Sequence, residues 1–373
     1  FFDFNQPLSD QVGVRLVGEV RRGESETDRI ENKRTSIFPS LSWAPNTDSQ
    51  LTVRLRYSDV STLDYSGLPT RGTVVDAPYS IPRSRIVAAE DMPDTTTETR
   101  GININWSQRL NDVWSWALTA AYTQAAVDQR GVFPTFFGNA VAESGPLLTV
   151  SGARLWDEFD SVTISPSVTA KLRSGNVAHT VMAGFDYDRT RDDAFLRLSP
   201  DPFFNFGVIG AIDITNPVYP AWVEPLEPSP PDQENRYRST AVFLQDQVDI
   251  GEKLHLLGNL RYTRVKADDV NAVFGVNNHS INSKLTPRLG VSYEFTPHTS
   301  AFIGYGKGMR VPLFAVFSEP PKPEESEQTE IGVRLKNLAG VTATFAVFDL
   351  TVKNALVADP ANPGFSIQSG KQR

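Results

Sequence analysis

The sequence predicts an all-β protein, the wall of a transmembrane antiparallel β-barrel, and two observations support this fold class. Segments in which apolar and polar residues alternate recur along the whole chain. The connections between these segments are alternately tight turns and long polar loops. Because successive side chains of a strand point to opposite faces, each segment has one apolar and one polar face. Short turns at one end and long loops at the other are typical of outer-membrane barrels.

Residues 51–58 show the alternation clearly. Leu51, Val53 and Leu55 alternate with Arg54 and Arg56. An arginine costs roughly 2–4 kcal/mol at the bilayer midplane, so we expect both arginines on the inner face and the aliphatic residues toward lipid. A soluble β-sandwich would also alternate. Three features favour the membrane barrel. They are charged arginine side chains on the polar face, aromatic residues at the ends of many apolar faces, and long strands.

Fifteen strands are predicted from the alternation. They cover residues 2–7, 11–22, 33–44, 49–60, 98–109, 113–127, 155–172, 177–191, 235–250, 253–265, 284–295, 299–310, 327–337, 341–354 and 365–373. The longer connections between them are predicted at residues 22–33, 61–97, 128–154, 192–234, 266–283, 311–326 and 355–364, and all of them are assigned to the cell exterior.

Composition excludes several other classes of protein. The 373 residues carry a net charge of −8, which argues against a nucleic-acid surface. The absence of Cys excludes disulfides, thiolate metal sites and cysteine nucleophiles. No run approaches the ~18 apolar residues of a transmembrane helix, and the first residues lack the pattern of a signal peptide.

Several motifs occur in an order that belongs to one known family. They are Ala241–Gln247 (AVFLQDQ), Leu257–Tyr262 (LGNLRY), Asp213–Tyr219 (DITNPVY), Tyr305–Pro312 (YGKGMRVP), a P-x-x-S-x-Q-x-E-x-G run from Pro323 to Gly332, Phe348–Thr351 (FDLT) and Pro363–Gln368 (PGFSIQ). With them, the chain resembles the barrel of TonB-dependent ferric-siderophore receptors.

The resemblance implies a fold and a function. The chain would be a partial barrel domain over residues 1–373, about 15 strands of a 22-stranded barrel, with one strand missing before it, six missing after it and the plug domain absent. It would take up a ferric siderophore across the outer membrane of a Gram-negative bacterium, surrounded by outer-membrane lipid. The TonB–ExbB–ExbD complex would supply energy through the missing plug. The ferric siderophore would be the transported ligand, so no resident cofactor is expected.

Catalytic and metal-binding residues are not expected. The four histidines form no convincing constellation with the many Ser and Asp residues, since a catalytic triad is defined by geometry and not by residue counts. Asp192-Asp193 and Asp268-Asp269 could hold a hard cation, but paired acids on loops are usually solvated. The chain is therefore predicted not to be an enzyme.

Aromatic residues in and beside the predicted outer loops are the candidate ligand contacts. Aromatic side chains supply contact area at low entropy cost. The alternative is that they only pack the loops against one another. The candidates are Tyr65, Tyr79, Phe133, Phe136, Phe137, Trp156, Phe203, Phe204, Tyr219 and Trp222, and capture is expected to depend chiefly on loops 128–154 and 192–234.

Two other functions remain open. One is a TonB-dependent receptor for another cargo, such as cobalamin or a glycan. The other is a structural or adhesive barrel without transport. A plug encoded upstream of Phe1 would separate the receptors from the structural barrel.

Overall fold

The computed structural model describes residues 1–135, 145–201, 206–312, 320–338, 340–362 and 365–372. The regular secondary structure of these residues consists of sixteen strands in one antiparallel sheet. They are β1 (Phe2–Pro7), β2 (Val12–Glu24), β3 (Glu31–Asn46), β4 (Ser49–Thr62), β5 (Thr95–Arg109), β6 (Trp114–Pro134), β7 (Leu147–Ser174), β8 (Val177–Leu198), β9 (Val208–Asp213), β10 (Gln233–Ile250), β11 (Leu254–Asn271), β12 (Val276–Thr296), β13 (Thr299–Arg310), β14 (Glu324–Leu338), β15 (Val341–Ala358) and β16 (Ser366–Gln372). None of the described residues forms a helix that is long and apolar enough to cross a membrane.

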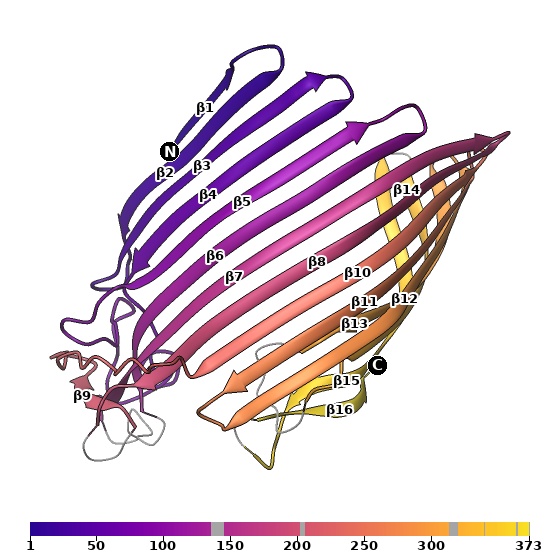
Figure 1. The fold of residues 1–373 in the computed structure, drawn as a ribbon. Coiled ribbons are helices and arrows are strands. Elements are labelled where there is room, and N and C mark those ends of the chain that lie inside the picture. The colour runs from indigo at the N-terminus through magenta and orange to yellow at the C-terminus, as the bar shows by residue number, and fades with distance from the viewer. Residues whose placement is uncertain (136–144, 202–205, 313–319, 339, 363–364, 373) are drawn as a thin grey trace.

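The strands follow one another around a curved wall (Figure 1). Each strand pairs with its neighbour in sequence, except that β8 pairs directly with β10. The short strand β9 pairs with the outer end of β7 instead. Among the described residues, β1 and β16 end the ladder and each pairs with one strand. The all-β fold class is therefore confirmed.

One face of the wall is apolar, and the strand register shows it in complete rows. Phe185 of β8, Val242 of β10, Tyr262 of β11 and Leu285 of β12 lie side by side, and each is 40–54% exposed. Exposure of large apolar side chains to water is unfavourable in free energy. A sheet face of this kind is stable against lipid.

The other face is polar and carries the two arginines of β4. Arg54 lies opposite Ser40 of β3 and Asn103 of β5, and Arg56 lies opposite Gly101. Leu55, between them, lies opposite Ile102 and so belongs to the apolar face. The predicted separation of the arginines from the aliphatic residues is confirmed.

The polar face is the concave one. Arg261 of β11 forms an ion pair with Asp186 of β8, although β10 lies between these strands. Side chains from strands that are not neighbours approach each other on the inner side of a curved sheet. The polar face therefore lines the inside of the wall and the apolar face covers its outside.

The structure corrects several predicted connections. The loop predicted at residues 266–283 is wrong, because β11 continues to Asn271 and a tight turn leads into β12 at Val276. β6 and β7 likewise extend through most of the predicted loop 128–154, and β8 continues to Leu198. Beyond the apolar rows both faces of a strand contact water, so the alternation that predicts strands disappears although the strands continue.

Candidate ligand-binding site

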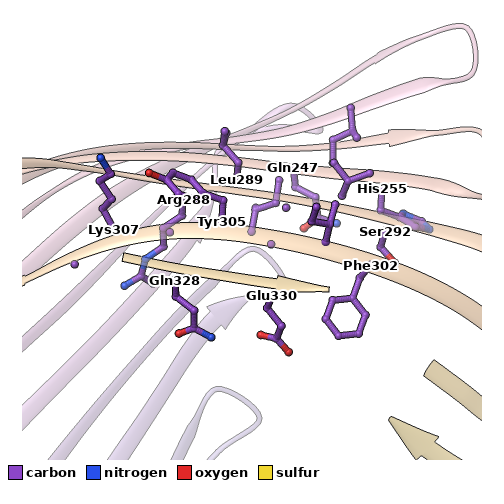
Figure 2. Close-up of a pocket in the computed structure, with 18 of the residues that line it drawn as sticks. Gln247, His255, Arg288, Leu289, Ser292, Phe302, Tyr305, Lys307, Gln328 and Glu330 are labelled. Atoms are coloured by element: carbon purple, nitrogen blue, oxygen red, sulfur yellow. The ribbon is translucent and has the colours of Figure 1, made fainter. Parts of the chain in front are cut away.

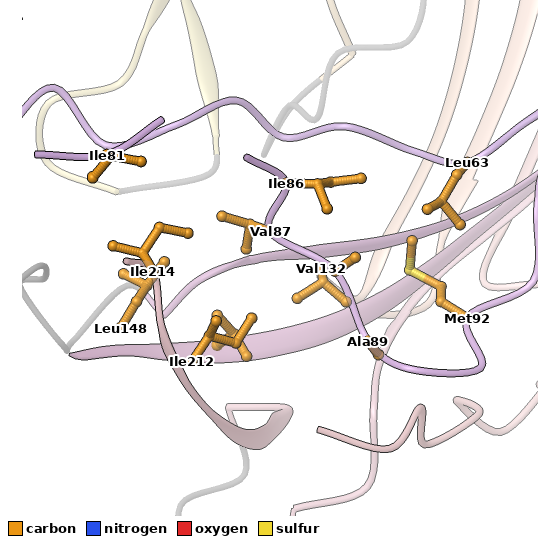
Figure 3. Close-up of a cluster of buried hydrophobic side chains, with 12 residues drawn as sticks. Leu63, Ile81, Ile86, Val87, Ala89, Met92, Val132, Leu148, Ile212 and Ile214 are labelled. Carbon is orange, nitrogen blue, oxygen red and sulfur yellow. The ribbon is translucent and has the colours of Figure 1, made fainter. Parts of the chain in front are cut away.

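The long connections at one end of the wall fold together over the ends of β6 and β7. We call this assembly the loop cap: residues 63–94, the ends of β6 and β7, β9 and residues 214–232. Figure 3 shows its core, in which Ile86, Val87 and Ile212 are fully buried beside Leu148 of β7 and Val132 of β6. A cluster of this kind is a hydrophobic core in the ordinary sense.

Hydrogen bonds between loops hold the cap together. The backbone N–H of Glu90 donates to the carbonyl of Pro220 at 2.7 Å. The guanidinium of Arg29 donates to the carbonyl of Ala89 at 3.0 Å and lies 4.6 Å from the ring centroid of Tyr219. Three connections that are far apart in sequence therefore form one body.

An ion network fastens the cap to the wall. Arg154 of β7 makes a bidentate contact with Asp128 of β6, at 2.8 and 3.1 Å. Arg130 contacts Asp128 at 3.0 Å and Glu224 at 3.0 Å. Burial raises the pKa of Glu224, but hydrogen bonds from Arg130 and from Trp222 outweigh it and hold that pKa below its usual value. Such charge-assisted pairs fix geometry more firmly than neutral hydrogen bonds do.

The structure places the predicted aromatic residues in different surroundings. Tyr79, Tyr219 and Trp222 pack against the core of the cap. The indole N–H of Trp222 donates to Glu224 at 2.6 Å. These residues show the packing role that was the alternative to ligand contact, whereas Tyr65, in the same loop as Tyr79, is 41% exposed.

Two further aromatic candidates lie within strands. Trp156 was expected at a loop edge but lies within β7, where it stacks on Phe195 with ring centroids 5.7 Å apart. Phe133 lies within β6, on the opposite face from Val132. Phe136, Phe137, Phe203 and Phe204 lie outside the described residues. Their contact with a ligand stays a prediction.

A hollow of about 670 Å³ opens on the concave face of β11–β14. We call it the polar groove. Its floor is low because Gly290 and Gly304 lie opposite each other in the ladder, and a Cβ added at Gly304 would meet no atom within 4 Å. Figure 2 shows Gln328 and Glu330 on the side of the sheet opposite Leu289. The groove thus offers hydrogen-bonding groups around bare backbone.

Buried and half-buried carboxyls line the concave face above the polar groove, where β7, β8, β10 and β11 extend past the apolar rows. Asp192 is 2% exposed and accepts a hydrogen bond from the amide of Asn235 at 2.7 Å. Asp269 accepts one from the hydroxyl of Tyr237 at 2.5 Å. Burial, together with the nearby Asp192 carboxylate, raises the pKa of Asp157 to about 6.

These carboxyls do not form a metal site. Across the part of the chain that the structure describes, no group of three or more His, Asp or Glu residues is arranged to hold a metal ion. They remain a strip of hydrogen-bond acceptors below the loop cap.

Comparison with known families identifies the family to which this barrel wall belongs. Residues 8–373 match the family described as "TonB dependent receptor-like, beta-barrel". The chain belongs to the TonB-dependent receptor family. The prediction from sequence motifs is confirmed, and other members supply a context for the loop cap and the polar groove.

Individual relatives of this TonB-dependent receptor chain are distant. The metal-pseudopaline receptor CntO of Pseudomonas aeruginosa is 28% identical over 392 residues, which cover 100% of this chain and 52% of that protein. The ferrichrome outer membrane transporter/phage receptor of Escherichia coli is 23% identical over 402 residues, with 100% and 52% covered. The chain therefore spans about half the length of these relatives.

Solved structures share the fold. The siderophore receptor PiuA of Acinetobacter baumannii superposes with a TM-score of 0.83 at 19% identity, over 99% of this chain and 57% of that one. The ferric-catecholate import receptor Fiu of E. coli superposes with a TM-score of 0.80 at 16% identity, over 99% and 58%. Likeness at this identity establishes the barrel fold of the wall.

The ion network and the core of the loop cap were not predicted from the sequence. One signal was present: the apolar run Ile86–Ala89 stands out in an otherwise polar connection. The roles of Arg130 and Arg154 gave no such signal, because their partners lie on different strands and loops. Only the register of β6 against β7 brings Arg130 directly opposite Arg154.

Proposed function

We propose that this chain forms the wall and the capture surface of an outer-membrane receptor. This receptor would take up a ferric siderophore by TonB-dependent active transport. One observation carries the proposal: the curved wall has a polar concave face and an apolar outer face, and its long connections fold into an aromatic cap at one end. Such an arrangement can hold a large polar chelate outside and pass it along a wet interior. Family membership and the siderophore receptors among the solved structures support it.

The wall would act together with a plug domain and an energising complex. The polar groove would face a plug domain, and the TonB–ExbB–ExbD complex would pull on that plug. The outer-membrane lipid of a Gram-negative cell would cover the apolar rows. The iron would stay inside its chelator, so the protein would need acceptors, donors and aromatic surface and no resident cofactor. Neither catalysis nor nucleic-acid binding belongs to this proposal.

A chelate of a metal other than iron is the second candidate cargo. The similarity to a relative named metal-pseudopaline receptor favours it. A growth experiment distinguishes the ferric siderophore from the other metal chelate as cargo. It uses a receptor-deficient strain that expresses the full-length protein. Rescue by a ferric siderophore in iron-poor medium supports the first, and rescue only by another metal chelate supports the second. No rescue by any chelate in the panel would contradict both.

Tyr65 tests the capture surface within the same receptor. We expect Tyr65→Ala to weaken binding of the rescuing chelate several-fold, because an exposed ring in the cap supplies contact area. Binding is measured by quenching of intrinsic tryptophan fluorescence. Tyr122→Ala is the matched control, since Tyr122 is equally exposed but lies on the apolar face. Equal binding by both variants would remove Tyr65 from the site.

A further inference from the structure

Two arginines on the concave face of the wall line a second hollow, which is separate from the polar groove. Arg54 and Arg56 of β4 are exposed, and together with Ser40 of β3 and Asn103 of β5 they surround a space of about 450 Å³. We call this space the arginine hollow. The Cα atoms of the two arginines are about 7 Å apart, because residues i and i+2 of a strand lie on the same face. Two positive charges therefore share one hollow.

The arginine hollow has no negative charge to balance these two arginines. None of the described residues that line it is Asp or Glu, apart from whatever a ligand would add. Across the part of the chain that the structure describes, no carboxylate lies within ion-pair distance of Arg54 or Arg56. Like charges at this distance repel each other, so a bound anion would lower the free energy of the site.

Other arginines of the concave face share their surroundings with a carboxylate. Arg261 of β11 forms the ion pair with Asp186 that was described above. Arg288 and Arg334 line the polar groove, but Glu330 lines it too. The arginine hollow differs from both places, because no carboxylate side chain lines it.

Arg15 of β2 shows which chemical group fits a guanidinium at this place. It lines the same hollow and donates two hydrogen bonds to the carboxylate of Asp3, from Nε to Oδ1 at 2.9 Å and from Nη2 to Oδ2 at 2.5 Å. Such fork-shaped pairs match the planar carboxylate group. Asn103 lies opposite Arg54, and its amide oxygen accepts a hydrogen bond from Asn105, which leaves its NH2 group as a further donor. The hollow is thus equipped for carboxylate groups.

The arginine hollow lies below the outer connections, within the part of the wall that would span the membrane. Arg54 and Arg56 occupy the middle of β4, which runs from Ser49 to Thr62. Leu55, between them, belongs to the apolar outer face. A ligand in the hollow has therefore left the loop cap and is on its way across the membrane.

We propose that the arginine hollow is a transit site for an iron chelate that carries free carboxylate groups. Arg54 and Arg56 would hold these carboxylates while the chelate passes along β3–β5, after its release from the capture surface. A neutral chelate would gain nothing from the two charges. The proposal rests on the transport function proposed above. It adds the charge class of the cargo and the sector of the wall along which the cargo moves.

The first experiment asks which chelates the full-length receptor takes up. A receptor-deficient strain that expresses it is grown in iron-poor medium with ferric citrate or ferric rhizoferrin, which carry free carboxylates, and with ferrichrome or ferrioxamine E, which are neutral. We expect rescue by at least one carboxylate chelate. Rescue only by chelates without free carboxylates would overturn this inference and leave the proposed transport intact, whereas no rescue by any chelate would contradict the transport itself.

The second experiment separates passage from capture. The full-length variant Arg54→Gln/Arg56→Gln is compared with the wild type for the carboxylate chelate that rescues growth. Uptake of radioactive iron is measured in energised cells, and surface binding is measured in cells whose proton-motive force has been dissipated. We expect the uptake rate at saturating chelate to fall at least fivefold and the Kd of surface binding to stay within twofold. Uptake of a neutral chelate, where the wild type transports one, should stay unchanged.

A matched control separates the arginine hollow from net charge. Arg238→Gln/Arg264→Gln removes the same charge from the outer face of β10 and β11, because these residues share a strand face with Val242 and Tyr262. This variant should take up the chelate at the wild-type rate. The heat-dependent gel migration of every variant checks that the barrel is folded, and only folded variants are compared.

Three results of the second experiment would overturn the proposal. The first is wild-type uptake of the carboxylate chelate by the folded double variant. The second is a loss of surface binding as large as the loss of uptake, which would assign the two arginines to capture. The third is a lower melting temperature together with equally slow uptake of every transported chelate, which would assign them to a contact with the receptor's own plug domain.

Discussion

The loop cap and the wall are built from similar aliphatic residues that are placed in opposite ways. In the cap, Ile86, Leu148 and Ile212 have no exposed surface, whereas in the wall Leu244 is 52% and Val347 is 74% exposed. The cap therefore owes its fold to burial of apolar surface away from water. The wall is held by backbone pairing between strands and needs lipid against its outer face. One chain thus has a part that is stable in water and a part that is stable against lipid, and the boundary between these two parts crosses β6 and β7.

The largest expected effect is in the core of the cap. Leu148→Ala should destabilise the cap by about 2–5 kcal/mol, because it removes buried methyl groups and leaves a cavity. Limited proteolysis at residues 63–94 and 214–232 measures the opening. Leu244→Ala is the control, and it should leave the cap unchanged because Leu244 lies on the apolar face of the wall. Equal protease sensitivity of the two variants would show that the cap has no core of its own.

A charge on the outer face of the wall should act on insertion and not on the cap. Leu244→Arg should cost roughly 2–4 kcal/mol in the bilayer, since the arginine has no water at that depth. The yield of folded barrel in lipid vesicles measures it, and Gln245→Arg on the concave face serves as the control. Normal insertion of Leu244→Arg would mean that this row does not face lipid.

The smallest effect depends on pH and lies where cap and wall meet. The pKa of Asp157 is raised to about 6, chiefly by burial and by Asp192, so the folded state favours the protonated carboxyl. This contribution to stability is fully present below about pH 4 and is lost as the pH rises past 6. Asp157→Asn should therefore raise the melting temperature at pH 8 and leave it nearly unchanged at pH 4.

Asp213 provides a control of opposite sign for this pH dependence. Hydrogen bonds from the hydroxyl and N–H of Thr215 and from the N–H of Asn216 hold its pKa below the usual value. Asp213→Asn should therefore lower stability at pH 8, and this loss should shrink as the pH falls below 4. A pH-independent effect of Asp157→Asn on melting would contradict the assignment.

The alternation of residues was enough to predict the wall. Fifteen of the sixteen described strands were anticipated, as was the separation of Arg54 and Arg56 from Leu55, because lipid on one side and water on the other impose a period of two. β9 was missed, because it lies within the predicted loop 192–234. Strand ends were missed where that asymmetry stops. The turn after Asn271 was hidden for this reason, because Asp268 and Asp269 place a charged residue on each face of β11 and the alternation ends there.

The candidate site was predictable only in part. Aromatic residues in the outer connections were identified from the sequence, but sequence alone does not distinguish a ring that binds a ligand from one that packs a loop. Tyr219 and Trp222 turned out to pack against the cap, whereas Tyr65 keeps an exposed face. The cap itself depends on contacts between loops 63–94 and 214–232, and such distant pairings leave no local pattern.

The way each strand pairs with its neighbour also bears on how the sheet assembles. Almost every backbone pairing in the wall closes only a hairpin, so the contact order is low for an all-β protein, and hairpins can be added one after another. The main exceptions are the pairing of β4 with β5 across residues 63–94 and the pairing of β8 with β10, whose connection runs from Leu198 to Gln233. Loop-closure entropy grows only slowly with length, and β9 shortens the free part of this connection by docking on β7. The docking of β9 would thus bring β10 within reach of β8 across one of the long connections of the wall.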